Sequence, residues 1–200
     1  MMTFNEAHSR DYASRMVRFL LDRGADPFLE CTENKEMILH EIFHSGGVIQ
    51  PFLENPELDI ERRDPMGKTL LLAAAGCYVG TNSYACKLPA FPFRGGWCSP
   101  AHWQEGDPTR AMTLYERGAD ITAVDNDGNN VLHYMAKVDT SQNRVFEVEA
   151  LRTLKLFAKK APELVHQTNV DGQTPMSIAK ENNSSWAIEA LRPYEISEQE

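Results

Sequence analysis

The chain has 200 residues, of which 42% are hydrophobic and 24% are charged, which is typical of a soluble folded protein and disfavours a fibrous or disordered chain. Its 20 basic and 29 acidic side chains give a formal net charge of −9, which disfavours binding to nucleic acid or to an anionic membrane. Neither a membrane-spanning stretch nor a secretory signal is visible, so we expect an intracellular protein of the cytoplasm or nucleus.

Two phrases recur along the chain. An apolar helical run ending in Arg-Gly-Ala-Asp occurs at 16–26 and again at 111–120. The second phrase is an acidic residue shortly before glycine, followed by a short apolar run. It occurs at 64–74, 125–136 and 169–179, with a version lacking the glycine at 34–42.

The spacing of these copies favours a repeat. Leu39 and Leu71 lie 32 residues apart, whereas Leu71 and Leu132 lie 61 apart and Leu132 and Met176 lie 44 apart. A unit of about 33 residues that is lengthened in two places explains all three intervals.

Each phrase has a physical role in such a unit. Asp-Gly is typical of a tight turn, because glycine takes positive φ without steric cost. The residues that follow the turn are expected to be helix N-caps: Thr69, Asn130 and Thr174. Pro175 suits the first helical position, and alanines 73–75 keep the first helix thin. Gly24 and Gly118 are expected to end the second helix in the left-handed conformation.

The sequence therefore predicts an all-α chain of five units, each a turn, a short helix, a turn and a longer helix. The expected units are 3–30, 31–63, 64–124, 125–168 and 169–192. The first is expected to combine a polar, poorly matching first helix with a well-formed second one. The third carries a long insertion at 77–106, the fourth an extension at 137–152, and the acidic tail 193–200 is expected to fray.

Taken together, these phrases resemble the ankyrin repeat, which has a Thr-Pro-Leu-His-x-Ala signature. The best match is Thr-Pro-Met-Ser-Ile-Ala at 174–179, while Leu39-His40 and Leu132-His133 keep the Leu-His pair and Thr69 keeps the threonine. The resemblance covers 3–192. It implies a helical solenoid that binds another protein as a monomer, without a cofactor, and it implies that His40 and His133 brace the adjoining loops by hydrogen bonds.

In that arrangement the turn tips and first helices form a concave binding face. The candidate contact residues for the third unit are Arg62, Arg63, Met66 and Lys68, and those for the fourth are Asn126, Asn129 and Asn130. Methionine and asparagine at such positions suit adaptable polar contacts around apolar anchors.

The insertion at 77–106 is rich in glycine and proline, so it does not read as helix. It holds six of the chain's 18 aromatic residues and only three charged ones, the opposite of a solvated linker. It either packs on the stack or presents an aromatic surface to a partner, and both can hold. The candidate contact residues here are Phe91, Phe93, Arg94 and Trp97.

The four cysteines are Cys31, Cys77, Cys86 and Cys98, and a reducing compartment predicts free thiols. An alternative is a structural zinc site made by Cys77, Cys86, Cys98 and His102, because Cys3His is a known zinc ligand set. The spacing resembles a CCCH zinc finger except for its long middle interval, and His102 also fits a turn. A zinc-stabilised insertion would favour a metal-dependent or nucleic-acid-related role.

No motif for catalysis is present. The chain lacks Gly-x-Ser-x-Gly, His-Glu-x-x-His and a Walker loop. Gly67-Lys68-Thr69 resembles the end of a Walker loop, but Arg62 stands where its first glycine is required. We therefore expect a non-catalytic protein, with an adaptor arm of a larger enzyme as a further alternative.

Overall fold

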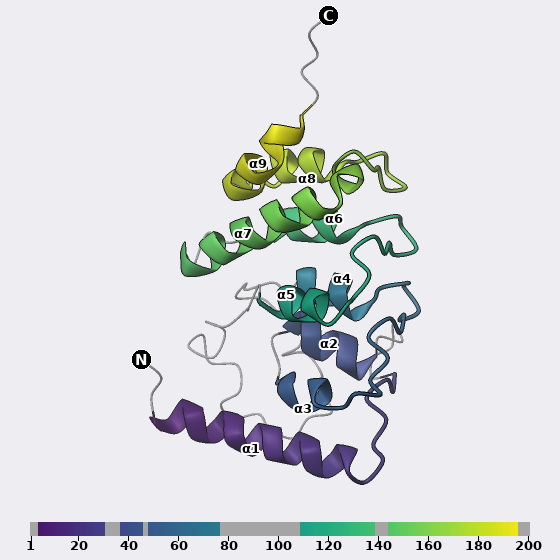
Figure 1. The fold of residues 1–200 in the computed structure, drawn as a ribbon, viewed down its shortest axis with the longest axis vertical. Helices are drawn as coiled ribbons and strands as arrows, with labels where there is room; N and C mark the ends of the chain where they lie inside the picture. Colours follow the sequence, from purple (N-terminus) through teal and green to yellow (C-terminus); the bar gives the residue numbers. More distant parts are fainter. Residues whose placement is uncertain (1–3, 31–36, 46–47, 77–108, 139–143, 196–200) are drawn as a thin grey trace, which may run out of the picture.

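The computed structural model describes residues 4–30, 37–45, 48–76, 109–138 and 144–195 (Figure 1). Regular structure in these residues is helical, and strand pairing among them is limited to the isolated bridges Glu30–Met37 and Val124–Asn130. The helices are α1 (Phe4–Leu21), α2 (Ile38–Ser45), α3 (Gln50–Leu53), α4 (Leu70–Ala75), α5 (Thr109–Glu116), α6 (Val131–Ala136), α7 (Arg144–Lys160), α8 (Pro175–Glu181) and α9 (Ser185–Leu191), with the 3-10 turns η3 (Pro162–Val165) and η4 (Arg192–Tyr194). The expected all-α class is confirmed.

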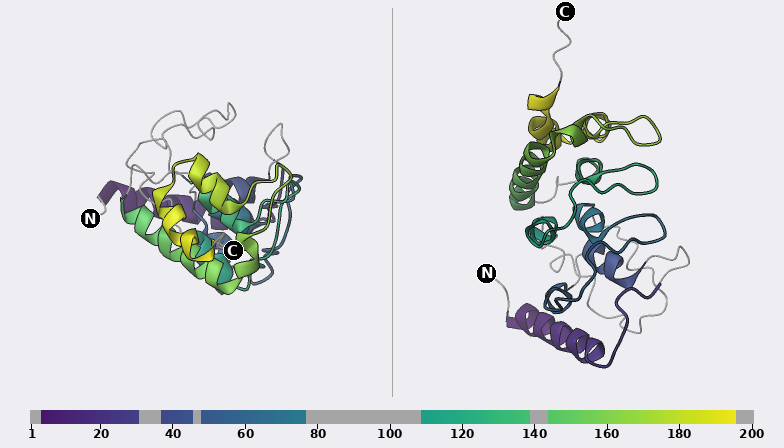
Figure 2. Two further views of the ribbon diagram at one scale, coloured as in Figure 1. Left: turned by 90° about the horizontal axis from the view of Figure 1, so that it is seen from above. Right: turned by 45° about the vertical axis from the view of Figure 1, so that its right-hand side comes forward.

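The helices stack in two rows along the long axis of the molecule, from α1 at one end to α9 at the other (Figure 1). One row is formed by α2, α4, α6 and α8, each in contact with the next, and in the other row α5 contacts α7 and α7 contacts α9. Helices α4 and α5, α6 and α7, and α8 and α9 pack as pairs across the rows. The loops that precede α4, α6 and α8 project side by side from one edge of the stack (Figure 2).

Local sequence sets where the short helices begin. Thr69, Asn130 and Thr174 have extended backbones, and their side chains accept backbone N–H groups of the first helical turn. These bonds satisfy N–H groups that have no partner inside the helix. Pro175 occupies the start of α8, where no N–H is needed. The expected N-caps are confirmed.

Two helices end at glycine, as expected. Gly24 follows α1 with a φ of +80°, and Gly118 follows α5 with a φ of +90°. In both cases the next residue bonds back to a carbonyl within the helix: Ala25 to Leu20 and Ala119 to Leu114, each at 3.0 Å. Both helices thus end in the same left-handed motif.

The core runs without interruption between the two rows. All six residues of α4, Leu70–Ala75, are buried, and their small alanines allow α2 and α6 to pack on either side. Tyr115 of α5 meets Phe157 of α7 edge to face, with ring centroids 5.5 Å apart. Burial of this kind supplies most of the stability of short helices, because isolated short helices are only marginally stable in water.

The first unit differs from the expectation. The sequence was expected to form two helices within 3–30, but the structure has one helix there, α1, of 18 residues. The expectation was wrong because residues 4–21 contain no glycine or proline. Nothing in the local sequence ends the helix before Gly24.

The start of the acidic tail also differs. Residues 193–200 were expected to fray, but Pro193 and Tyr194 belong to η4, and Tyr194 packs against the core. Glu195 forms an ion pair with Lys180, with Oε1 and Nζ 2.6 Å apart. Residues 196–200 lie outside the described part of the chain.

No helix within the described ranges combines the length and the apolarity that crossing a membrane requires.

Candidate functional site

Three turns, at 64–68, 125–129 and 169–173, share one hydrogen-bonding design. In each, the first residue donates its N–H to the carbonyl of the fifth at 3.0–3.1 Å. Its side-chain oxygen accepts the N–H groups of the third and fifth residues at 2.7–3.1 Å. The fourth residue is glycine with a φ of 73–79°, which other residues adopt only at a cost. The three tips are therefore held in one rigid conformation.

Main-chain hydrogen bonds join each tip to the next. Asn126 donates its N–H to Met66 O at 3.0 Å, and Val170 donates its N–H to Asp127 O at 2.8 Å. Apolar side chains remain in solvent along this edge, with Met66 42% and Val170 70% exposed. We call the edge formed by the three turns the tip edge.

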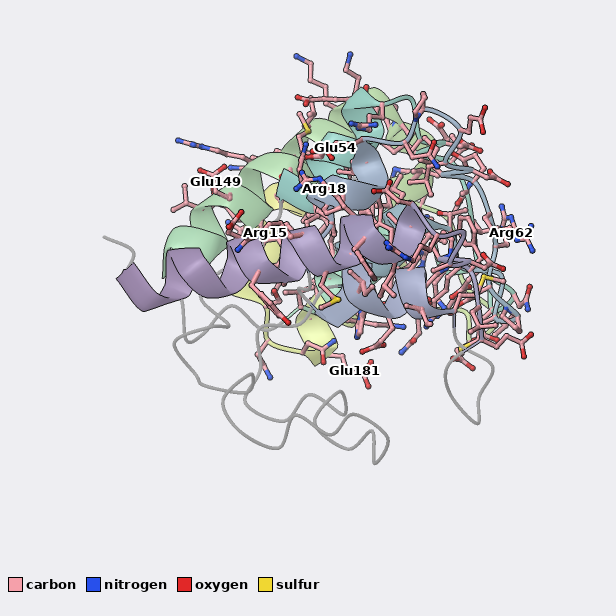
Figure 3. All side chains as sticks on the ribbon, turned by 90° about the horizontal axis from the view of Figure 1, so that it is seen from below. Arg15, Arg18, Glu54, Arg62, Glu149 and Glu181 are labelled. Atoms are coloured by element: carbon pink, nitrogen blue, oxygen red, sulfur yellow. The ribbon has the colours of Figure 1, made fainter. Side chains whose placement is uncertain are left out.

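The basic candidates lie at the tip edge. Figure 3 shows Arg62 on this edge and Glu149 on the opposite side of the stack. The Arg62 guanidinium lies 5.5 Å from the centre of the Phe28 ring, a cation–π contact. Arg63 donates from Nη1 to the carbonyls of Gly67 and Val124, so this exposed side chain also braces the joint between two units.

The asparagine candidates have unequal positions. Asn126 is exposed, and its amide donates to Pro65 O at 2.9 Å, across to the preceding tip. Asn129 is only 6% exposed; its amide donates to Asp125 and its oxygen accepts from Asn169. Asn129 therefore has no surface to offer a partner, and we assign it a structural role. Its place beside exposed neighbours in the sequence did not reveal this burial.

Asn130, a further candidate, is fully buried as the N-cap of α6. Its amide also donates to Leu164 O at 3.0 Å. Like Asn129, Asn130 forms its hydrogen bonds within the stack and has no surface to offer a partner.

Two buried histidines brace the turns, as the resemblance implied. His40 Nε2 lies 3.0 Å from Arg62 O and 2.9 Å from Lys68 O. His133 Nε2 donates to Gln173 O at 2.9 Å. Each histidine thus ties its helix to the turn of the following unit.

Burial lowers the pKa of both His40 and His133 below the usual value of a histidine. His133 Nδ1 accepts the N–H of Asn130 at 3.2 Å, so that nitrogen must be unprotonated while Nε2 carries the hydrogen. The neutral ring is the form that serves both bonds. This geometry suits a brace.

A hollow opens on the first-helix row between the second and fourth units. Its walls are formed by His40, Glu41, His44, Asp64, Lys68, Ala73 and Tyr134. The space within its walls is about 50 Å³ and continues into an open mouth, so the walls enclose room for a few water molecules. The sequence predicted Lys68 here but neither Asp64 nor Tyr134.

The remaining candidates cannot be placed. Phe91, Phe93, Arg94 and Trp97 lie outside the described residues, as do the possible zinc ligands Cys77, Cys86, Cys98 and His102. In the ranges that the structure covers, no three His, Cys, Asp or Glu side chains are grouped to hold a metal ion.

The sequence analysis also missed Val170, the most exposed apolar side chain at the tip edge. Aligning the three turns would have identified it, because Val170 follows Asn169 as Asn126 follows Asp125.

The described residues thus define an all-helical stack with a rigid edge of turns and a hollow beside it. Compared with known proteins, the chain matches no protein-family model and no curated protein.

Proposed function

We propose that this chain is an ankyrin-type helical repeat module, without catalytic activity, that binds another protein through the tip edge and the adjoining first-helix row. The observation that carries the proposal is the set of three equivalent turns joined by main-chain hydrogen bonds. This is the arrangement expected from the repeat signature at 174–179. Similar residues recur in the same order at 64–74, 125–136 and 169–179, which supports a repeat.

The exposed side chains of the tip edge support a binding role. Met66 and Val170 are apolar groups in solvent on a backbone fixed by hydrogen bonds. A partner that covers them gains apolar burial while little conformational entropy is lost, because the turns are already ordered. Arg62, Arg63 and Asn126 add polar groups around these anchors, the usual composition of an interface.

The proposal is tested by quantitative affinity purification with mass spectrometry. The double variant Met66→Ser/Val170→Ser removes both apolar anchors. Val148→Ser is the matched control, because Val148 is 44% exposed on α7, away from the tips. We expect the principal partner to be captured by the wild type and the control, and lost from the double variant. Equal capture by all three would contradict binding at the tip edge.

A further inference from the structure

Tyr134 and Ala73 occupy the same position in successive units. Each stands four residues after its helix N-cap, Asn130 and Thr69 respectively. The two turns that lead into these helices have the same hydrogen bonds, and both contain a glycine of positive φ. The side chains at this position can therefore be compared directly.

In the fourth unit the tyrosine completes the turn. The Tyr134 hydroxyl donates to Asp125 Oδ2 at 2.7 Å, and the Asn129 amide donates to the same oxygen at 3.0 Å. The other oxygen, Oδ1, accepts the backbone N–H groups of the turn. Both oxygens of this buried carboxylate are therefore satisfied, as a buried charge requires.

In the third unit the equivalent carboxylate is incomplete. Asp64 Oδ1 accepts the N–H groups of Met66 and Lys68 at 2.9 and 2.8 Å. No hydrogen bond among the described residues reaches Oδ2, because Ala73 stands where Tyr134 donates and Lys68 stands where Asn129 donates. Asp64 is only 6% exposed, and it lines the hollow described above.

The space that a tyrosine would fill is open. The hollow described above lies beside Asp64 and Ala73, and the Tyr134 ring forms one of its walls. Most of its walls are polar or charged, but Ala73 and the Tyr134 ring offer surface to a ring, and Asp64 offers a carboxylate oxygen to a hydroxyl group. A phenol satisfies both, as Tyr134 does one unit further along.

We propose that this hollow is a binding pocket for a tyrosine side chain of the partner protein, whose hydroxyl donates to Asp64 Oδ2. The inference rests on the proposed function in one respect, namely that a protein supplies the tyrosine. A hydrogen bond to a charged acceptor is about twice as strong as a neutral one. The pocket should therefore prefer tyrosine to phenylalanine.

The pocket is tested without a partner, by NMR titration with N-acetyl-tyrosinamide and N-acetyl-phenylalaninamide. Both probes carry the same ring, and only the first carries the hydroxyl group. We expect the amide signals of Met66, Lys68 and Ala73 to shift, with the tyrosine probe binding about tenfold more tightly. Equal affinity, or shifts that avoid these residues, would overturn the proposal.

Two variants sharpen the test. Asp64→Asn keeps the turn, because Asn169 already accepts the same two N–H groups at 3.1 and 2.9 Å, but it removes the charged acceptor. The tenfold preference for the tyrosine probe should disappear. Ala73→Tyr places a ring in the hollow from within the chain, and it should abolish binding of both probes while the helical circular dichroism is kept. Asp171→Asn, at an exposed tip, is the control and should bind like the wild type.

Failure of the pocket and failure of the proposed function can be told apart. If the double variant of the tip edge loses the partner while the two probes bind equally, only the tyrosine pocket is wrong. If the tyrosine probe binds preferentially while no variant affects partner capture, the pocket holds as a phenol site and binding at the tip edge is wrong.

Discussion

The hydroxyl group of Tyr134 lies 2.7 Å from Oδ2 of Asp125 and donates a hydrogen bond to it. The bond ties α6 to the turn that precedes it. Burial and this bond raise the pKa of Tyr134 above the usual value of a tyrosine, so the hydroxyl keeps its proton at physiological pH. Tyr134 is therefore a permanent donor to the Asp125 carboxylate.

Tyr134→Phe removes this donor and leaves a buried carboxylate with one bond fewer. We expect the free energy of unfolding to fall by about 1.5–3 kcal/mol, the range for hydrogen bonds to charged groups. Urea unfolding followed by circular dichroism measures it. Tyr12→Phe is the control, because Tyr12 is exposed on α1, and it should leave the stability unchanged. A loss equal to that of the control would show that the bond contributes nothing.

The three turn glycines allow a graded test of the joints between units. A Cβ added at Gly172 meets nothing within 4 Å, at Gly128 it comes to 3.4 Å from Asn169 Cα, and at Gly67 to 2.8 Å from Asn126 N. All three have positive φ, so alanine costs about 1–3 kcal/mol at each. Contact of the added Cβ with the next turn should add to that cost. We therefore expect the destabilisation to increase from Gly172→Ala, which makes no such contact, through Gly128→Ala to Gly67→Ala.

Thermal unfolding of these three variants is the measurement. The loss of melting temperature should follow the same order, and Gly67→Ala is expected to weaken the joint most because the added Cβ comes closest to the neighbouring backbone there, 2.8 Å from Asn126 N. Equal melting temperatures for all three variants would show that contacts between adjacent tips do not stabilise the stack.

Much of the fold could be predicted because its determinants are local. Thr69, Asn130 and Thr174 act as caps through bonds to residues two or three positions away, and such bonds follow from the sequence alone. The single long helix α1 was not predicted, because the repeat pattern suggested a break for which the local sequence has no breaker. Tyr194 was not predicted to pack, because its burial depends on the neighbouring helices.

The buried histidines predict a pH dependence of stability. Burial lowers the pKa of His40 and His133 in the folded protein, whereas in the unfolded chain both titrate near 6.5. Below about pH 6.5 the unfolded state therefore binds protons that the folded state does not. We expect stability to be complete above that pH and to fall as the pH decreases towards the lower pKa of the folded state.

Urea unfolding from pH 8 to pH 5 measures this slope. The double variant His40→Asn/His133→Asn cannot titrate at these positions, so its stability should depend less on pH over that window, whatever its absolute value. A slope equal to that of the wild type would show that other groups cause the acid sensitivity.

The binding module and the zinc-stabilised insertion predict different zinc contents for the purified protein. We expect much less than one zinc ion per chain by elemental analysis, and Cys98→Ser should leave the melting temperature almost unchanged. Structural zinc contributes directly to folding. One zinc per chain, with melting on chelation, would favour a zinc-stabilised insertion.

The candidate site could be predicted only in outline. Arg62, Met66 and Asn126 were assigned to the tips from the turn pattern, and the structure has them at the exposed edge. The burial of Asn129 depends on Asn169, 40 residues away, which no local pattern contains. The hollow beside Asp64 arises from a difference between units, Ala73 against Tyr134. It becomes visible only when the units are compared in space.

Hydrogen–deuterium exchange of the protein, alone and in complex with the partner it captures, tests the central claim most directly. The account predicts slower exchange in the complex at 62–68, 124–130 and 168–173, with little change in α7 and α9. Protection confined to α7 and α9, with the tips exchanging as in the free protein, would contradict it.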